Sequence, residues 1–203
     1  MKEHLFSRTS CVILSAGSST RMGEHKALLK FGEDSTFIQH ITNTYALSGF
    51  DQIIVVANIE LAEQMRERGI HLPESALIVI NDKPESGRFY SLQTGVHHLK
   101  EGNDCFFQNV DNPFTSSDLL TTLILEKKKA DVIIPAYKQK AGHPVLLSPN
   151  VVQEICTTSD PDFRINDFLR QFHQQRIETL DGRILANINA PEDYINAGFQ
   201  KKG

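Results

Sequence analysis

The chain of 203 residues has no basic excess and no long hydrophobic run. Its 21 Lys and Arg residues are outnumbered by 25 Asp and Glu residues, which gives a net charge of −4. Affinity for long nucleic acids comes mainly from basic side chains that neutralise phosphates, so duplex DNA binding is excluded as the default function. A small phosphorylated ligand is not excluded, because one local cluster of cations can hold it.

No apolar run reaches the roughly 18 residues that a membrane span requires, and no secretory signal is recognisable. We therefore expect a cytoplasmic protein that binds neither membrane nor nucleic acid. The cysteines Cys11, Cys105 and Cys156 are far apart and form no C-x-x-C pair, which argues against a disulfide framework or a zinc site. The length favours one domain, residues 1–203, which can bury a core without such crosslinks.

Short apolar runs alternate with segments of helical periodicity over the first two thirds of the chain. This alternation predicts an α/β fold, a Rossmann-like three-layer sandwich with a mostly parallel sheet and helices on both faces. Strands are predicted at Cys11–Leu14, Gln52–Ala57, Ala76–Ile80, Cys105–Val110 and Val132–Ala136, and helices at Thr36–Ser48, Ile59–Arg68, Phe89–Lys100 and Ser116–Lys129. The later, weaker pattern suggests a short strand at Val145–Leu147, a helix at Asn166–Phe172 and a late strand at Ile184–Ile188.

A loop rich in Gly and Ser follows the first strand, and ligands of such sheets bind at this carboxyl edge. Its spacing fits neither a Walker A loop nor G-x-G-x-x-G. Two glycines permit close backbone approach, three hydroxyls can donate hydrogen bonds, and two cations can meet phosphate oxygens. These features favour phosphate binding over the alternative, a flexible turn with two surface cations. The residues are Gly17 and Gly23, Ser18, Ser19 and Thr20, and Arg21 and Lys26.

The segment Leu14–Leu29 resembles the signature L-x-x-G-x-S-x-R-M-G-x-x-K-x-L-L of the MobA-like nucleotidyltransferases. It is most similar to the molybdenum cofactor cytidylyltransferase branch, because guanylyltransferases usually have Gly-Gly where this chain has Ala16-Gly17. The resemblance implies a nucleotide-diphospho-sugar-transferase-like fold and extends over nearly the whole chain. Four further segments agree in order and spacing: Asn81…Gly87-Arg-Phe-Tyr-Ser91…Gly95, Val110–Phe114, Gly142–Val145 and Asn187–Asp193.

The resemblance also implies roles for individual residues. Arg88 and His143 are expected on the acceptor side of the cleft, although Arg88 can be merely solvated and His143 can be a turn histidine bonded to backbone. For Ser91, the alternative is a helix N-terminal residue. Arg21 and Lys26 are the expected catalytic cations, and the expected nucleotide-binding residues are Leu14, Ser15, Ala16, Gly17, Ser18, Ser19, Gly23, Asn81, Gly87 and Ser91.

Asp111 follows an apolar strand, where a carboxylate faces the ligand crevice and can bind Mg²⁺. The alternative is an Asx-turn, because Asp-Asn-Pro is also good turn chemistry. The resemblance favours the metal and implies Asn189 as a second ligand, at a place where this branch commonly has Asp. The amide removes one negative charge and is expected to weaken Mg²⁺ binding; Asn189 can also cap the final helix.

Taken as a whole, the resemblance implies Mg²⁺-dependent transfer of CMP from CTP to the terminal phosphate of molybdopterin, with release of pyrophosphate. Approximate residues 8–110 are expected to form the nucleotide-binding half, and 111–203 the acceptor-binding half. The expected partners are CTP or another NTP, a molybdopterin-type acceptor, and a molybdoenzyme or its maturation chaperone. The alternatives are a guanylyl- or sugar-1-phosphate nucleotidyltransferase, or a catalytically weak nucleotide-binding maturation factor.

Overall fold

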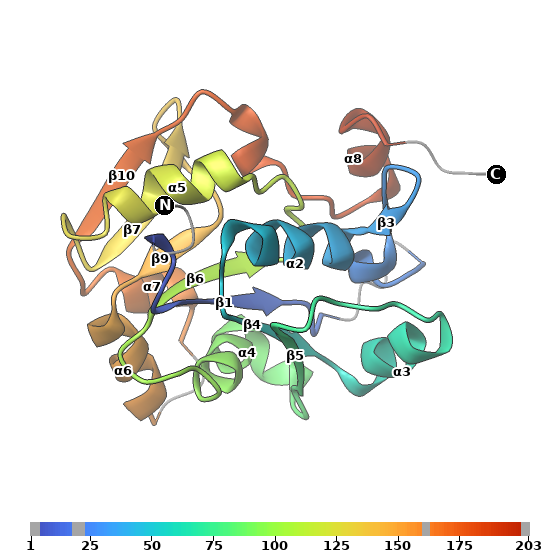
Figure 1. Ribbon diagram of the computed structural model, residues 1–203, viewed down its shortest axis with the longest axis horizontal. Coiled ribbons are helices and arrows are strands. Elements are labelled where there is room, and N and C mark those ends of the chain that lie inside the picture. The colour runs from blue at the N-terminus through green and yellow to red at the C-terminus, as the bar shows by residue number, and fades with distance from the viewer. Residues whose placement is uncertain (1–4, 18–22, 160–162, 200–203) are drawn as a thin grey trace.

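The computed structural model describes residues 5–17, 23–159 and 163–199 of the chain. Its centre is an eight-stranded sheet with the order β10-β7-β9-β6-β1-β4-β5, and β8 pairs with β7 (Figure 1). Neighbouring strands are parallel, except that β9 is antiparallel to β6 and β7, and β8 to β7. The strands are β1 (Thr9–Leu14), β4 (Gln52–Ala57), β5 (Ala76–Ile80), β6 (Asp104–Asn109), β7 (Val132–Tyr137), β8 (Lys140–Ala141), β9 (Val145–Leu147) and β10 (Gln174–Glu178).

Helices pack on both faces of this sheet, because its central strands are apolar on both sides. In β1, Cys11 and Ile13 belong to one core cluster, while Val12 and Leu14 belong to the other. The predicted three-layer α/β sandwich is thus confirmed. The first core includes side chains of α2 (Phe37–Ser48), α3 (Ile59–Glu67) and α5 (Ser117–Leu125); the second includes those of α4 (Gly87–Val96), α6 (Pro149–Thr157) and α7 (Ile165–Leu169).

Local capping explains where the best-predicted helix begins and ends. The Thr36 hydroxyl accepts a hydrogen bond from the backbone of Gln39, whose side chain accepts one from the Thr36 backbone, forming a capping box. Gly49 ends α2 in the left-handed conformation, with φ of 97°. The predicted helices at 89–100 and 116–129 are shorter than expected, since α4 ends at Val96 and α5 at Leu125.

The prediction of a late strand at Ile184–Ile188 is wrong. Its first two residues end a short 3-10 helix, η4 (Gly182–Leu185), and residues 186–188 have no regular secondary structure. The edge position of the sheet is taken by β10. The sequence of β10 is mostly polar, with Gln175 and Ile177 half-buried and its alternate positions exposed, so it lacks the apolar run of a central strand. The helix α6 is likewise absent from the sequence-based prediction.

The parallel strands β1, β4 and β6 end together at one edge of the sheet. Leu14 is in register with Val56 of β4 and with Asn109 of β6. The chain then leaves each strand as a loop, so residues from distant parts of the sequence converge there. Among the described residues, no helix combines the length and apolarity that crossing a bilayer demands.

Candidate active site

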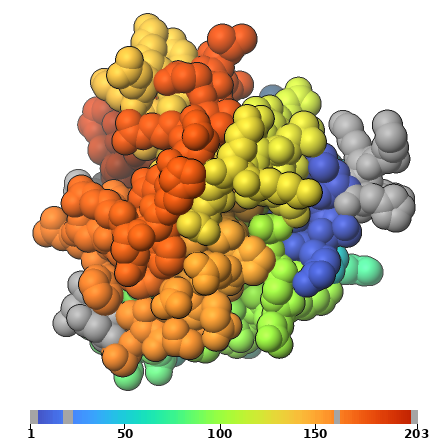
Figure 2. Space-filling view, turned by 90° about the vertical axis from the view of Figure 1, so that its left-hand side faces the viewer, coloured from blue at the N-terminus to red at the C-terminus, as the bar shows by residue number. Residues whose placement is uncertain are grey.

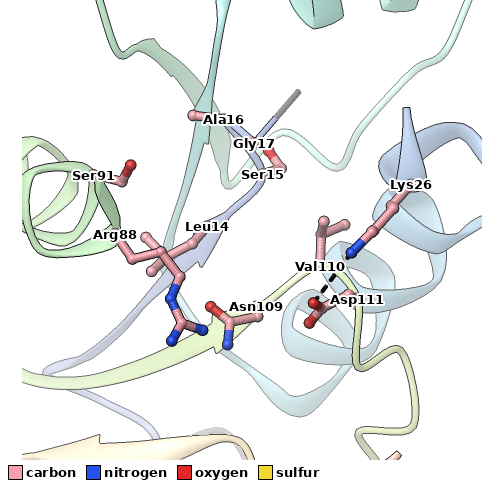
Figure 3. A pocket seen from close by; sticks show the side chains of 10 residues that line it. All are labelled: Leu14, Ser15, Ala16, Gly17, Lys26, Arg88, Ser91, Asn109, Val110 and Asp111. Atoms are coloured by element: carbon pink, nitrogen blue, oxygen red, sulfur yellow. Dashed lines mark hydrogen bonds and ion pairs between the residues drawn. The ribbon is translucent and has the colours of Figure 1, made fainter. Parts of the chain in front are cut away.

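A cavity of about 200 Å³ opens at this carboxyl edge, between the loop after β1 and the end of β6. Figure 3 shows Ser91 and Ala16 on one side of it, and Lys26 with Asp111 on the other. Seven predicted site residues therefore meet here together with Asp111. The complete lining is Leu14, Ser15, Ala16, Gly17, Lys26, Arg88, Ser91, Asn109, Val110 and Asp111.

The start of the loop is held in place by the neighbouring strand β4. The hydroxyl of Ser15 donates to the carbonyl of Val56 at 2.8 Å, and the side-chain amide of Asn58 donates to the carbonyl of Ala16 at 3.1 Å. Asn58 also caps α3 by accepting from the backbone of Leu61 at 2.8 Å. The Ser15 hydroxyl is thereby bonded to the protein backbone, and this residue shapes the cavity wall.

Later residues of the loop are only partly described. Gly17 lines the cavity, and Gly23 adopts a φ of 70°, a conformation that favours glycine. Ser18, Ser19 and Arg21, which we predicted as nucleotide-binding and catalytic residues, lie outside the described residues.

Lys26 joins two side chains that are distant in sequence. Its ammonium donates to Oδ1 of Asn189 at 2.6 Å and lies 3.5 Å from Oδ2 of Asp111. The side chains of Lys26 and Asp111 are 16% and 20% exposed, so this contact is only partly screened by solvent. The backbone supports the arrangement, because the amide of Ile188 donates to the carbonyl of Asp111 at 2.8 Å.

Among the described residues, Asp111 forms no Asx-turn and the Asn189 side chain does not cap the final helix. Asp111 Oδ1 is buried and accepts no hydrogen bond, so among the described residues no Asx-turn uses it. The helix α8 (Pro191–Asn196) is instead capped by Asp193, whose Oδ2 accepts from the backbones of Asn189 and Ala190 at 2.9 and 2.8 Å. The Asn189 side chain is therefore directed to Lys26 rather than to the helix.

The donor set at this cluster fits a hard cation such as Mg²⁺. Asp111 offers an unpartnered carboxylate oxygen, and Asn189 offers an amide oxygen. Within the part of the chain that the structure describes, no group of three or more His, Cys, Asp or Glu side chains is placed to hold a metal. A cation here would thus take few protein ligands and complete its coordination with phosphate oxygens and water, as Mg²⁺ usually does.

The opposite wall is formed by the first turns of α4. Asn81 is buried beneath it, with its amide donating to Ser91 Oγ at 2.9 Å and its Oδ1 accepting from the backbone of Lys83 at 2.8 Å. Ser91 lines the cavity from within the helix and is not at its N-terminus, whereas Asn81 only supports it. Gly87 opens α4 with a φ of 85° and lies outside this cavity.

Gly95, in a segment that resembles the nucleotide-binding loop, has a packing role. A Cβ atom there would lie 2.4 Å from Cγ1 of Val12, so the glycine lets α4 approach β1 closely. Arg88 is exposed, and Figure 3 shows its guanidinium beside Asn109 at the mouth of the cavity. It forms no hydrogen bond or ion pair with any described residue.

His143 lies at the side of the site that β9 forms. Burial is the main reason why the pKa of its imidazole is lowered to about 4, with nearby Arg88 lowering it further and Asp111 opposing. The neutral ring accepts a hydrogen bond at Nε2 from the amide of Asn109 at 3.2 Å. Asn109, the last residue of β6, thus links His143 to the cavity. The sequence does not single it out, because the strand predicted there runs on to Val110.

Asn112, directly after Asp111, is a further polar residue at the end of β6. It is buried, and its side-chain amide nitrogen donates to the backbone carbonyl of Ile184 at 2.8 Å. The backbone carbonyl of Asn112 accepts from the side chain of Gln108 at 2.6 Å. Asn112 therefore ties η4 to the end of β6 and has a structural role.

The chain is similar in sequence to known proteins. A sequence profile described as the MobA-like NTP transferase domain matches residues 11–177. The chain is 26% identical to the molybdenum cofactor cytidylyltransferase of Escherichia coli K12, over 94% of this chain and 96% of that one. It is also 30% identical to a probable molybdenum cofactor guanylyltransferase of Rhodopirellula baltica, over 56% and 53% of the two chains.

Solved structures share the fold. Rv0371c of Mycobacterium tuberculosis H37Rv has a TM-score of 0.78 at 20% identity, covering 93% of this chain and 97% of that one. A second structure of that protein is a complex with manganese; it has a TM-score of 0.73 at 19% identity and covers 93% and 96% of the two chains.

Proposed function

The chain belongs to the MobA-like NTP transferase family and is a nucleotidyltransferase, and from this premise we propose its reaction. It transfers CMP from CTP to the terminal phosphate of molybdopterin and releases pyrophosphate. A P–O bond forms between an acceptor phosphate oxygen and the α-phosphorus, and the bond from the α-phosphorus to the bridging oxygen of pyrophosphate breaks. The protein itself takes little part in the covalent chemistry, so its contribution to the rate comes mainly from positioning the substrates and stabilising charge.

The observation that carries the proposal is the cluster of Lys26, Asp111 and Asn189. Lys26 and Asp111 line the cavity after β1, and Asn189 joins them through its hydrogen bond with Lys26. Lys26 is a compact point charge at the wall of the cavity, suited to phosphate oxygens. Asp111 and Asn189 would hold Mg²⁺, which when bound offsets the charge of the phosphate oxygens. The manganese in the structurally similar Rv0371c supports a divalent cation in this fold.

We assign the two sides of the site to the two substrates, CTP and the acceptor. Residues from about 8 to 110 supply the loop after β1 and the α4 wall, which we assign to CTP. Residues from about 111 onward supply His143 and Asn189, and we assign the acceptor to this half. Arg88 and Asn109 lie between the two sides and would receive the acceptor phosphate as it attacks the α-phosphorus, in line with the departing pyrophosphate.

The choice of CTP over GTP rests on the residue beside Gly17. Ala16 is buried, its carbonyl is fixed by Asn58, and its methyl group lines the cavity. The cytidylyltransferase branch resembles this chain there, and one similar curated protein is a cytidylyltransferase. A guanylyltransferase is the second candidate, because other similar proteins are described as probable guanylyltransferases.

A nucleotide panel tests this proposal. The melting temperature is measured with CTP, GTP, ATP and UTP, each with and without Mg²⁺, and CTP with Mg²⁺ is expected to stabilise most. A ligand at 100 times its Kd adds about 2.7 kcal/mol to the free energy of unfolding. Pyrophosphate release is then measured with molybdopterin and with glucose 1-phosphate as acceptors.

Each alternative has its own outcome in this panel. The largest stabilisation by GTP indicates a guanylyltransferase, and turnover with glucose 1-phosphate alone indicates a sugar-1-phosphate enzyme. CTP binding without turnover on either acceptor indicates a maturation factor for a molybdoenzyme, with Asn189 as the reason for its weak catalysis.

A further inference from the structure

Gln108 is a polar residue in the interior of the molecule that the proposed reaction has not used. It belongs to β6, where the preceding residues Cys105, Phe106 and Phe107 are buried apolar side chains, and it is itself fully buried. It does not line the cavity of the candidate site. An amide that is removed from water costs free energy unless its polar atoms are hydrogen-bonded. The partners of Gln108 therefore indicate what its burial achieves.

Both polar atoms of the Gln108 side chain have partners. Its Oε1 accepts from the hydroxyl of Tyr45 at 2.8 Å and from the hydroxyl of Thr115 at 2.6 Å. Its Nε2 donates to the backbone carbonyl of Asn112 at 2.6 Å. That carbonyl can only accept a hydrogen bond, so the amide group is fixed in this orientation. Gln108 thus connects α2, which carries Tyr45, with the turn that follows β6.

This turn presents Asp111 to the cavity of the candidate site. Gln108 bonds to the turn at two points, four and seven residues farther along the chain. Before Asp111, the backbone amide of Val110 donates to the carbonyl of Leu14 at 3.1 Å. After Asp111, the carbonyl of Asn112 is held by Gln108. The position of the Asp111 carboxylate therefore depends on the bond from Gln108 to Asn112.

The turn also holds the segment that carries Asn189. The side-chain nitrogen of Asn112 donates to the carbonyl of Ile184 in η4 at 2.8 Å. The backbone amide of Ile188 donates to the carbonyl of Asp111, also at 2.8 Å. This segment belongs to the C-terminal third of the chain, whose orange and red residues cover most of the face shown in Figure 2. The bond that fixes the turn is thus connected to both candidate cation ligands.

Mg²⁺ is exacting about the positions of its ligands. It requires near-octahedral geometry at about 2.0–2.1 Å, and the proposed site offers it few protein ligands. A small displacement of one carboxylate therefore weakens such a site, and residues that orient the ligands contribute to the affinity. We propose that Gln108 is a positioning residue of the cation site, because its bond to Asn112 fixes the turn and thereby sets Asp111 against Asn189. This inference rests on the proposed function, in which those two residues hold the cation.

The test measures the binding of Mn²⁺ alone, by water proton relaxation, to the wild-type chain and to Gln108→Met. Mn²⁺ binds the same oxygen ligands as Mg²⁺. Methionine keeps the length of the side chain and removes the amide. The Kd for Mn²⁺ is expected to rise about tenfold, the lower end of the cost of losing a residue that orients metal ligands. Asp111→Asn identifies the site, because it is expected to remove most of this binding.

Asn103→Leu is the matched control. Asn103 is a buried amide directly before β6, at the opposite end of the strand, and its Nδ2 donates to the hydroxyl of Ser10 at 2.9 Å. This variant and Gln108→Met each lose a buried, hydrogen-bonded amide, and both are expected to melt below the wild-type temperature. Loss of the fold lowers the number of Mn²⁺ sites per chain and leaves their Kd unchanged. A positioning role predicts a Kd that rises in Gln108→Met and stays at the wild-type value in Asn103→Leu.

A second variant keeps the test decisive if Gln108→Met alone destabilises the chain strongly. It adds Tyr45→Phe and Thr115→Val, so that the two hydroxyls bonded to Gln108 are removed together with its amide. Replacing both partners of a buried hydrogen bond by apolar groups of similar shape costs little stability, and the same rise in Kd is expected. In pyrophosphate release, both variants are expected to need about tenfold more Mg²⁺ and to recover the wild-type kcat when Mg²⁺ is in excess.

Two results overturn the inference and leave the proposed reaction intact: equal Mn²⁺ affinity in wild type and Gln108→Met, or an equal loss of affinity in Asn103→Leu. A wild-type chain that binds no Mn²⁺ contradicts the cation site and the inference together. CMP transfer, measured separately, distinguishes failure of the proposed function. Mn²⁺ binding that depends on Gln108, in a chain that transfers no CMP, supports the positioning role and removes the transferase.

Discussion

The Asn189→Asp variant probes the least expected feature of the site, an amide where a carboxylate is usual for this branch. Asn189 Oδ1 is 2.6 Å from the ammonium of Lys26, beside the unpartnered oxygen of Asp111. The substitution adds one negative charge without changing the size of the side chain. We expect the Mg²⁺ concentration for half-maximal turnover to fall.

The size of the effect follows from the charges. At an effective dielectric constant of about 20, two unit charges 4 Å apart interact by roughly 4 kcal/mol. Desolvation of the new carboxylate, and its attraction to Lys26, offset most of this gain for the metal. A net 1–2 kcal/mol, or about tenfold in Mg²⁺ affinity, is the expected outcome.

The assay is pyrophosphate release from CTP and molybdopterin over a series of Mg²⁺ concentrations. Asn187→Asp is the matched control, because this neighbour is exposed and its amide, among the described residues, donates only to the carbonyl of Leu185, at 3.5 Å. An exposed charge there is screened and should leave the Mg²⁺ dependence unchanged. The assignment of Asn189 as a metal ligand fails if Asn189→Asp does not alter this dependence, or if the control alters it as much.

Three further predictions address catalysis, packing and pH. Lys26→Ala is expected to lower kcat by about 10²–10³-fold in the pyrophosphate assay, because it removes a preorganised positive charge. The control Lys30→Ala, at an exposed lysine nearby in the sequence, is expected to keep wild-type turnover. Equal rates in both variants would remove Lys26 from the mechanism. Gly95→Ala is expected to reduce the free energy of unfolding in urea by about 1–2 kcal/mol, because the new methyl group meets Val12, and an unchanged midpoint would contradict this packing role. The pKa of His143 is about 4 in the folded chain, below the value of about 6.5 of an unfolded histidine. Between these two pH values the unfolded state binds more protons than the folded state. The free energy of unfolding therefore falls as the pH decreases from 6.5 to 4, by up to about 3 kcal/mol. His143→Gln should show a smaller loss of stability between pH 6.5 and 4 than wild type, and identical pH profiles would show that the ring is not buried as described.

The middle of the sheet could be predicted from the sequence because its strands are short apolar runs between capped helices. Strands such as Gln52–Ala57 have the predicted bounds, and α2 ends at Ser48 as predicted. The polar edge strand β10 could not be predicted, because an edge strand needs no continuous apolar run. The short, mostly apolar segment Ile184–Ile188 was predicted as the late strand instead, although it does not pair with the sheet.

The candidate site was predictable only in part. Asp111 could be predicted at the site because it follows an apolar strand, and ligands bind at the carboxyl ends of such strands. The roles of Lys26 and Asn189 were predicted from the family resemblance. That Lys26 meets Asn189, 163 positions away, depends on the backbone bond from Ile188 to Asp111 and has no signature in the sequence.

The proposed transfer is tested by following the labelled α-phosphate of CTP. With Mg²⁺ and molybdopterin, the wild-type chain is expected to transfer the label to the acceptor and to release one pyrophosphate per label transferred. Asp111→Asn, which removes the charge of the proposed metal ligand and keeps its shape, is expected to abolish most of this transfer. The proposed reaction is contradicted if no label reaches the acceptor, and the metal site is contradicted if the variant transfers the label at the wild-type rate.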